Sequence, residues 1–426
     1  MAKETIDRKL HERKIKRPPK FAYNVLGNLW KLLYYKKLDV NVTDNVGVKD
    51  IKDNFIVVSN HASRLDYIYV GLPFLPHTLN FISGYNEFFR SHLFGILRFL
   101  QVIPKKNFTA DIYTVKEVSR VLKNGGNVMI FPEGMSSISG SNQPVALGSG
   151  KFIKHFGLPV YMCKISGGYL TNTKYNLEER PGRVDVTIDK LFTPEELETL
   201  SAEELEKTLN EKLYHDDYEW NKTARVKFRS RDGFANNMED LLYRCPRCGK
   251  EFTMKGVKNE IYCENCGNGA TINEYYDLIP FDDKCVIPET PKLWFDEERR
   301  VVKEEVKKDD FCLEEEVELA VLPEFKPIKN KETGVLVGKG TLTLTRKGLA
   351  FSGDKNGEKF EFFVEPKNLP TYGMCTDVNF FYTFVDGVYY EFRPKLRRTA
   401  KFLLATEEIH RLSGGKWQNF YEDFNK

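Results

Sequence analysis

A histidine and an aspartate five residues apart have side chains that could perform proton transfer together. His61 and Asp66 follow an apolar, β-branched run at residues 55–58, which predicts a buried strand that ends in polar turn residues. On one continuous helix the two side chains would point about 140° apart. They can therefore meet only if His61 precedes the helix.

Ser63, three residues before Asp66 and ahead of apolar residues, resembles the capping box of a helix start. In a capping box Asp66 is the third helical residue, and its carboxylate turns back toward His61. An Asp that accepts from one imidazole nitrogen fixes the tautomer, and the other nitrogen can take a proton from a hydroxyl. The alternative is that Asp66 only caps the helix, because a chain with seven His residues can contain such a pair by chance.

Four of the eight cysteines form two C-x-x-C pairs, each followed by a glycine. Cys245 and Cys248 form the first pair, Cys263 and Cys266 the second, and fourteen residues lie between the pairs. Four thiolates at this spacing suit a closed tetrahedral site. We predict a structural zinc ribbon, with iron as the alternative metal. The other cysteines are scattered, which favours a reducing compartment over disulfides.

Strands alternate with helices over residues 40–225, which predicts one α/β domain with a largely parallel sheet. The helix expected at residues 86–100 is apolar nearly all round, which favours a core helix over a wall for acyl chains. Further strands are expected at residues 127–131, 160–165 and 183–188, and further helices at residues 111–122, 151–156 and 193–214.

The N-terminal segment is basic, with eleven Lys and Arg against three acids between residues 3 and 37. Residues 1–20 are expected to form a flexible arm. The amphipathic helix that follows, with Trp30 and lysines at its far end, is typical of a bilayer interface; packing on its own domain is the alternative.

The whole chain of 426 residues has a formal charge of only +3, which does not indicate a nucleic-acid partner. Its 41% apolar content supports several cores. The sequence has no apolar run of membrane-spanning length and no signal peptide. We therefore expect a cytoplasmic protein, peripheral on the inner face of the membrane.

From residue 311 onward, alternating apolar residues predict strands, with a hairpin turn at Asp386 and Gly387 and a closing helix at residues 397–412. This order resembles pleckstrin-homology or GRAM-like modules, which would bind lipid headgroups or a protein; a packing domain is the alternative. The expected organisation is a basic arm and interface helix (1–40), an α/β domain (41–235), a zinc ribbon (240–275), a linker with a charged helix (276–310) and a β domain (311–426).

Four blocks in the first half of the chain resemble the glycerolipid acyltransferase family, whose best-known members are the 1-acylglycerol-3-phosphate acyltransferases. The first and third blocks are the specific ones. The blocks are Asn60-His61-x4-Asp66, a middle block with Gly95 that ends in Lys105-Lys106, Phe131-Pro132-Glu133-Gly134, and Leu158-Pro159-Val160 after Gly148-Ser149-Gly150-Lys151.

The resemblance implies that His61 is a general base, that Asp66 orients it and that Glu133 helps to position the acceptor. Glu133 could instead only brace its own turn through backbone amides. Acyl transfer from a thioester to an alcohol needs a base and an oxyanion stabiliser, so no catalytic cofactor is expected. Gly134 permits a close backbone approach, and amides around it could bind an anion.

The sequence departs from the family where the acceptor phosphate is usually held. The third block usually continues Thr-Arg-Ser, whereas Met135, Ser136 and Ser137 stand here. The middle block also has lysine where Arg is usual, and Tyr85 where Lys is common. Either Arg64, Lys105 and Lys106 hold the phosphate, with Gly134, Ser136 and Ser137 at the same site, or the acceptor is not a simple lysophosphatidate.

The expected function is transfer of a fatty acyl group from acyl-CoA or acyl-carrier protein to the hydroxyl of a lysophospholipid, 1-acylglycerol-3-phosphate first, in phospholipid synthesis. The expected partners are the donor, the lysolipid acceptor and a membrane surface. One alternative is an acyltransferase with a phosphate-free acceptor. The other, from a different class, is a catalytically silent adaptor that docks on membranes through the zinc ribbon and the β domain.

Overall fold

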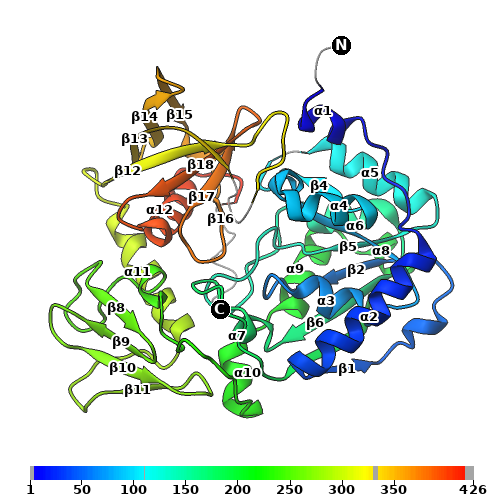
Figure 1. The fold of residues 1–426 in the computed structure, drawn as a ribbon, viewed down its shortest axis with the longest axis horizontal. Helices are drawn as coiled ribbons and strands as arrows, with labels where there is room; N and C mark the ends of the chain where they lie inside the picture. Colours follow the sequence, from blue (N-terminus) through cyan, green and yellow to red (C-terminus); the bar gives the residue numbers. More distant parts are fainter. Residues whose placement is uncertain (1–3, 110, 330–333, 418–426) are drawn as a thin grey trace.

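The computed structural model describes residues 4–109, 111–329 and 334–417. These residues form three sheets (Figure 1). The first belongs to the N-terminal half, the second surrounds the paired cysteines and the third forms the C-terminal part. This arrangement confirms the predicted mixture of an α/β fold and an additional C-terminal β sheet.

The first sheet has seven strands in the order β1-β7-β6-β2-β5-β3-β4. Neighbouring strands run parallel except β6 and β7, so the prediction of a largely parallel sheet is confirmed. The strands are β1 (Val40–Asp44), β2 (Ile56–Ser59), β3 (Leu79–Gly84), β4 (Ile103–Lys105), β5 (Asn127–Ile130), β6 (Val160–Ser166) and β7 (Val184–Phe192).

Helices cover both faces of this sheet, because its central strands are apolar on both sides. In β2, Val57 faces one core together with residues of α2 and α3, while Ile56 and Val58 face a second core with α5, α6, α8 and α9. The helices are α1 (Ile6–His11), α2 (Lys20–Leu38), α3 (Asp66–Gly71), α4 (Ser91–Phe99), α5 (Ile112–Lys123), α6 (Ser149–Phe156), α7 (Gly168–Thr171), α8 (Pro194–Thr199), α9 (Ala202–Leu213) and α10 (Asp217–Ala224).

The helix predicted at residues 86–100 is interrupted at Arg90. A 3₁₀ turn, Tyr85–Phe89, precedes α4, and Arg90 between them is extended. Its neighbours Phe89 and Ser91 exchange backbone hydrogen bonds with Ile328, at 2.7 and 2.8 Å. At Arg90, backbone hydrogen bonds to Ile328 thus take the place of the hydrogen bonds of a continuous helix. No residue of α4 is buried, so the expectation of a core helix is wrong.

The expected flexible arm is instead docked against the first sheet over its described residues. Ile6 and Leu10 of α1 are buried in a cluster with Tyr85 and Phe88. Ile15 is buried too, and its N–H donates to Glu117 of α5 at 2.7 Å. Charged residues surround these apolar positions, so composition alone concealed the packing.

The second sheet is antiparallel, in the order β11-β10-β9-β8. It extends to Pro280, beyond the predicted limit at residue 275. The predicted charged helix is α11 (Pro291–Glu305), which Thr290 caps and Pro291 opens. The strands are β8 (Met254–Val257), β9 (Glu260–Cys263), β10 (Gly269–Ile272) and β11 (Leu278–Pro280).

The third sheet has seven antiparallel strands in the order β15-β14-β13-β12-β18-β17-β16. Asp386 and Gly387, with φ of 51° and 78°, form the predicted hairpin turn. The strands are β12 (Cys312–Val321), β13 (Val335–Thr345), β14 (Gly348–Lys355), β15 (Glu358–Val364), β16 (Gly373–Met374), β17 (Phe381–Val385) and β18 (Val388–Pro394), followed by α12 (Thr399–Leu412).

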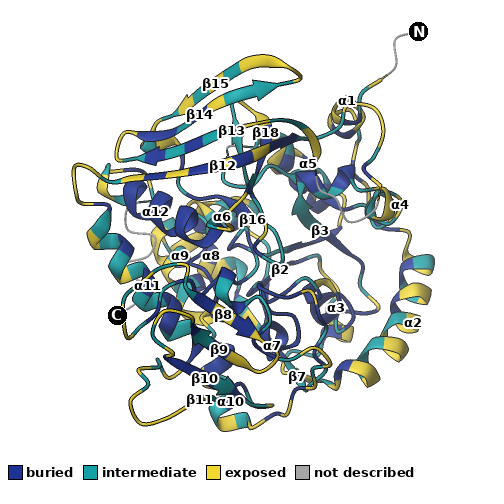
Figure 2. Ribbon diagram, turned by 60° about the vertical axis from the view of Figure 1, so that its left-hand side comes forward, coloured by how far each residue is buried: buried dark blue, intermediate teal, exposed yellow. Residues whose placement is uncertain are grey.

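Helices α12 and α2 differ in their surroundings (Figure 2). α12 is buried over most of its length and belongs to an apolar cluster that also includes α7, α11 and residues of the second and third sheets. By contrast α2 leaves a row of apolar side chains exposed. Within the described ranges, no helix combines the length and hydrophobicity needed to cross a membrane. The exposed apolar residues of α2 are Phe21, Val25, Leu26, Leu29, Leu32 and Leu33.

Candidate active site

The side chains of His61 and Asp66 meet across the turn between β2 and α3. Nδ1 of His61 lies 2.8 Å from Oδ2 of Asp66. His61 lies in the connecting segment and Asp66 is the first residue of α3. The two residues are therefore arranged as the spacing requires, with the imidazole ahead of the helix.

The turn itself is not the predicted capping box. α3 begins at Asp66, so Asp66 is not its third residue, and Leu65 before it makes no side-chain cap. The N–H and the hydroxyl of Ser63 both donate to Oδ1 of Asp66, at 2.9 and 3.0 Å. The ionised carboxylate is the stronger acceptor, so it collects donors from the preceding chain and holds that segment beside it. Arg64 likewise lies before the helix.

Asp66 is buried, whereas His61 reaches a cavity. Their side chains are 1% and 24% exposed. Burial raises the pKa of Asp66, and the hydrogen bonds from His61 and Ser63 oppose that rise. The imidazole stacks on Phe131 with ring centroids 4.3 Å apart. Its Nε2 atom makes no hydrogen bond within the described part of the chain, so this is the nitrogen available to a ligand.

Glu133 lies behind His61 and is not part of the cavity wall. Its Oε1 accepts from the His61 N–H at 2.6 Å, and its Oε2 accepts from the Gln143 N–H at 2.7 Å. Burial outweighs these donors and raises the pKa of Glu133 to about 8. Because both oxygens serve backbone amides, Glu133 fixes the peptide of His61, and a part in positioning the acceptor stays a prediction.

Gly134 and Ser136 line the cavity, but the amide of Gly134 is already used. The φ of Gly134 is +75°, which favours glycine, and its N–H donates to the Phe131 carbonyl at 3.2 Å. This amide closes the turn, and the prediction that amides around Gly134 bind an anion stays a prediction for its neighbours. Ser136 accepts a hydrogen bond from the ammonium of Lys174 at 3.1 Å.

Ser137 has a structural position, which corrects its assignment as a substrate-binding residue. Its N–H donates to the His61 carbonyl at 2.7 Å. Its hydroxyl donates to the Ser141 carbonyl at 2.6 Å and accepts from the Gly140 N–H at 3.0 Å. Ser137 is buried and absent from the cavity wall.

Two of the three predicted phosphate ligands line the cavity. Arg64 does so with one guanidinium N–H donated to the Leu177 carbonyl. Lys105, at the end of β4, also lines it, and burial lowers the pKa of each of these two cations. The ammonium of Lys106 instead donates to the Gly387 carbonyl of the β17–β18 turn at 3.2 Å. Its assignment as a phosphate ligand is corrected, because the side chain points to the third sheet.

The cavity has a volume of about 1130 Å³ and is open on one side. Much of its wall is apolar and comes from the inner faces of α2 and α4. Helix α4, which the sequence predicted to be a core helix, therefore forms part of the cavity wall. The lining residues of these two helices include Tyr23, Leu26, Trp30, Leu93, Ile96 and Leu97.

Sequence reasoning missed Lys174 and residues 374–377, which also line the cavity. Lys174 is 5% exposed, and besides Ser136 its ammonium donates to the Met374 carbonyl at 3.0 Å. Burial lowers the pKa of Lys174 to about 8. It stands outside the four family blocks, and the only signal is one lysine within the polar run of residues 171–176.

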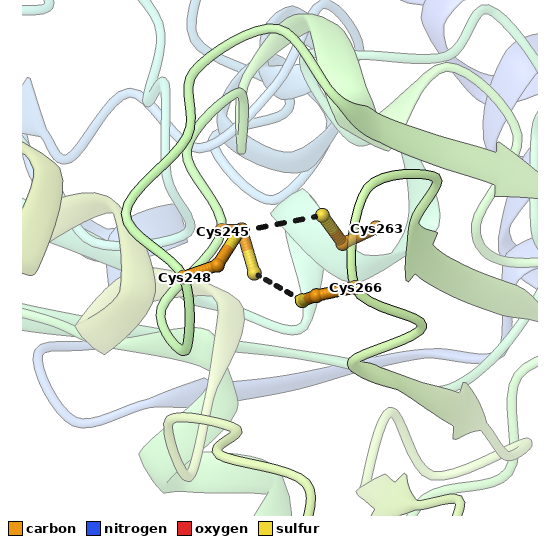
Figure 3. Close-up of side chains that lie close together, drawn as sticks. All are labelled: Cys245, Cys248, Cys263 and Cys266. Atoms are coloured by element: carbon orange, nitrogen blue, oxygen red, sulfur yellow. Dashed lines mark hydrogen bonds between the residues drawn. The ribbon is translucent and has the colours of Figure 1, made fainter.

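The four paired cysteines converge at one end of the second sheet (Figure 3). Their ligand atoms all lie within 4.8 Å of one another. The Sγ atoms of Cys245 and Cys266 are 3.6 Å apart, and those of Cys248 and Cys263 are 3.8 Å apart. A tetrahedron of thiolates around a metal at 2.3 Å has edges of about 3.8 Å. The cluster can therefore hold a metal ion.

Comparisons with known proteins match the segment that carries the histidine. Residues 37–166 match the family model described as Acyltransferase. A 1-acyl-sn-glycerol-3-phosphate acyltransferase from Cocos nucifera is 33% identical over 143 residues, which is 33% of this chain and 45% of the relative. The chain thus matches less than half the length of that relative.

One solved structure is similar over a comparable share of the chain. It is the 1-acyl-sn-glycerophosphate (LPA) acyltransferase PlsC from Thermotoga maritima, at 25% identity and a TM-score of 0.39. The match covers 48% of this chain and 79% of that one.

Replacing Glu133 by Gln should remove a pH dependence of stability. With a pKa of about 8 in the folded chain and a usual value of 4.5, the carboxyl binds more protons when folded than when unfolded between these pH values. Its contribution to the free energy of unfolding therefore falls by about 1.4 kcal/mol for each pH unit of increase in that range. Urea unfolding of Glu133→Gln between about pH 5 and pH 7.5 should show a flatter profile than the unchanged chain. Glu358→Gln, on an exposed hairpin residue, is the control, and an unaltered slope in Glu133→Gln would contradict the assignment.

Proposed function

We propose that this chain, whose residues 37–166 match the family model described as Acyltransferase, transfers a fatty acyl group from a thioester to the hydroxyl of a lysophospholipid. The donor is acyl-CoA or acyl-carrier protein, and the acceptor is 1-acylglycerol-3-phosphate. The observation that carries the proposal is the imidazole of His61, which is held by a buried carboxylate on one side and faces a large cavity on the other.

The chemistry needs one base, which His61 supplies. Nε2 takes the proton of the acceptor hydroxyl as the oxygen attacks the thioester carbonyl carbon. The Asp66 carboxylate stabilises the imidazolium that forms. The tetrahedral intermediate then expels the thiolate as the C–S bond breaks, and the thiolate takes the proton back from His61. The products are the ester and the free thiol, so atoms and charge balance without a catalytic cofactor.

The cavity offers suitable surroundings for both ends of a lysolipid. The apolar walls from α2 and α4 suit an acyl chain, and Arg64 and Lys105 place positive charge on the same cavity. Cations are the side chains expected beside a phosphate. These features support a phosphate-bearing lysolipid over a phosphate-free one.

Helix α2 supports binding at a membrane surface. Its inner face lines the cavity, whereas Phe21, Leu29 and Leu32 on its outer side are 85%, 50% and 74% exposed. Lysines accompany these apolar residues, a combination suited to the interface of an anionic bilayer. We therefore propose a peripheral position on the inner face of the membrane, where the lysolipid reaches the cavity along α2.

The cysteine cluster supports a structural zinc ion. Four thiolates fill a tetrahedral site and leave no position for substrate. Cys245 and Cys263 belong to the apolar cluster that joins the second and third sheets, so the metal would stabilise that junction. The C-terminal sheet remains a candidate lipid-headgroup or protein-binding module of the pleckstrin-homology or GRAM-like kind.

Replacing His61 by Ala should abolish acyl transfer without unfolding the chain. His61 is the proposed base, so we expect turnover to fall by about 10³-fold or more. Release of free thiol from acyl-CoA in the presence of 1-acylglycerol-3-phosphate measures the reaction. Asp66→Asn should also lower kcat, with a smaller effect on KM, because it acts through the imidazole. Undiminished turnover in His61→Ala would contradict the assignment of His61 as the base. If the unchanged chain turns over no lysolipid with either donor, the result would favour the catalytically silent adaptor.

An acidic residue in place of an apolar one on the outer side of α2 should weaken membrane binding. Leu32→Glu removes an apolar side chain worth about 1.5–3 kcal/mol when buried, so vesicle affinity should drop about ten-fold or more. Sedimentation with phosphatidylglycerol vesicles measures this. Ile112→Glu, on an 83% exposed residue of α5, is the matched control and should bind normally. Equal binding of all three proteins would contradict the proposed orientation.

Zinc should copurify with the chain at one ion per molecule. Cys248→Ser removes one ligand, and we expect loss of the metal and a lower Tm, because metal binding contributes directly to folding. Metal analysis by mass spectrometry and thermal unfolding measure these effects. Cys312→Ser, on an exposed cysteine outside the cluster, should change neither. A full zinc content in Cys248→Ser, or iron in the unchanged chain, would refute the assignment.

A further inference from the structure

Lys174 is a buried cation whose hydrogen-bond partners are neutral. Its ammonium donates to the Ser136 hydroxyl and the Met374 carbonyl, and it forms no ion pair with any residue in the described ranges. Burial of an ammonium is costly unless an opposite charge accompanies it. Because Lys174 lines the cavity, an anion bound there would offset this cost, and it would also reverse the lowering of the lysine pKa.

The ammonium lies beside the segment that holds the imidazole. Ser136, which accepts from Lys174, is followed by Ser137, whose N–H donates to the His61 carbonyl at 2.7 Å. Arg64, three residues after His61, lines the same cavity, and both cations interact electrostatically with Asp377. Two positive side chains thus approach the cavity near His61 from different elements.

A segment of the third sheet closes this end of the cavity. Residues 374–377, which comprise the last residue of β16 and the three that follow it, line the wall. The Asp377 N–H donates to the Lys174 carbonyl at 2.6 Å, and Met374 accepts from the Lys174 ammonium. The lysine is therefore positioned by the C-terminal sheet as well as by the α/β domain.

We propose that Lys174 and Arg64 bind the phosphate of the acceptor lipid, in a subsite that residues 374–377 close. The inference rests on the proposed function and extends it to a specificity determinant. The cation that the family usually carries at the position of Ser136 is supplied here from another segment, 3.1 Å from the serine hydroxyl. The third sheet is then part of the acceptor site, and a chain lacking it would lose discrimination between headgroups.

Replacing Asp377 tests the subsite because its effect on phosphate binding should be opposite to that of replacing Lys174. Its carboxylate interacts with both cations and would repel a phosphate bound between them. Burial raises the pKa of Asp377, but any ionised fraction opposes an anionic ligand. Removing the Asp377 charge should therefore strengthen phosphate binding, whereas removing the Lys174 charge should weaken it.

The experiment compares two acceptors that differ only in phosphate. For the full chain, kcat/KM is measured with 1-acylglycerol-3-phosphate and with 1-acylglycerol, using acyl-CoA and acyl-carrier protein donors in separate reactions. Lys174→Met should lower kcat/KM for the phosphate-bearing acceptor about ten- to hundred-fold. The value for 1-acylglycerol should change less than about two-fold. Lys174→Arg should retain the preference, and Asp377→Asn should increase it.

Lys164→Met is the matched control. Lys164 is a half-buried lysine of β6 that donates to the Lys212 carbonyl at 3.3 Å and does not line the cavity. Its replacement should leave both acceptors unaffected. Equal losses with both acceptors in Lys174→Met, or no loss with either, would overturn the proposal. If Lys174→Met fails to fold, the decision rests on Lys174→Arg and Asp377→Asn, and a weaker preference in Asp377→Asn overturns it.

Equilibrium binding without a donor separates failure of the subsite from failure of the proposed function. Even if the unchanged chain turns over neither acceptor, it should bind 1-acylglycerol-3-phosphate more tightly than 1-acylglycerol, and Lys174→Met should abolish that difference. Inorganic phosphate is the third ligand. Equal affinity for inorganic phosphate and for 1-acylglycerol-3-phosphate would overturn the assignment to a lipid headgroup, as would the absence of any preference in the unchanged chain.

Discussion

The buried carboxylate of Glu133 is the interaction on which the candidate site depends. β2 and β5 are parallel neighbours, so the segments that follow them leave the same edge of the sheet. Glu133, after β5, accepts from the amide of His61, after β2, while Ser137 donates to the His61 carbonyl. The N–H and the carbonyl of His61 are thus both hydrogen-bonded by residues of one turn. The backbone of His61 is consequently fixed independently of the contacts of its side chain.

The imidazole is then oriented by two further contacts of different kinds. Asp66 determines which imidazole nitrogen is hydrogen-bonded, and stacking on Phe131 determines the plane of the imidazole ring. Asp66 is itself held by Ser63. The histidine therefore belongs to a rigid scaffold, as acid–base chemistry requires, whereas the opposite wall of the cavity comes from α2, α4 and the third sheet. The proposed base and the cavity wall formed by α2 and α4 therefore come from separate parts of the chain.

The parts of the structure that sequence could predict depend on local pattern. The strand before His61, the cysteine pairs and the turn at Asp386 follow from neighbours within a few residues. The break at Arg90 could not be predicted, because it arises from pairing with Ile328, far along the chain. The direction of the Lys106 side chain could not be predicted for the same reason, since its partner lies in the third sheet. Likewise Lys174 acquires its position only when residues 374–377 pack against it.

Helix α2 shows how one sequence segment can satisfy two separate apolar contacts. Gly27 permits close approach to Leu75, since a Cβ there would lie 3.1 Å from both of its δ carbons, and this brings the inner face, with Trp30, to the cavity. The outer face gains nothing from that packing, yet it carries exposed apolar side chains among its lysines. Leaving Leu32 in water forgoes the roughly 1.5–3 kcal/mol that burial provides. The membrane surface that we propose for α2 would cover these residues, and it would lie beside the cavity that the inner face lines.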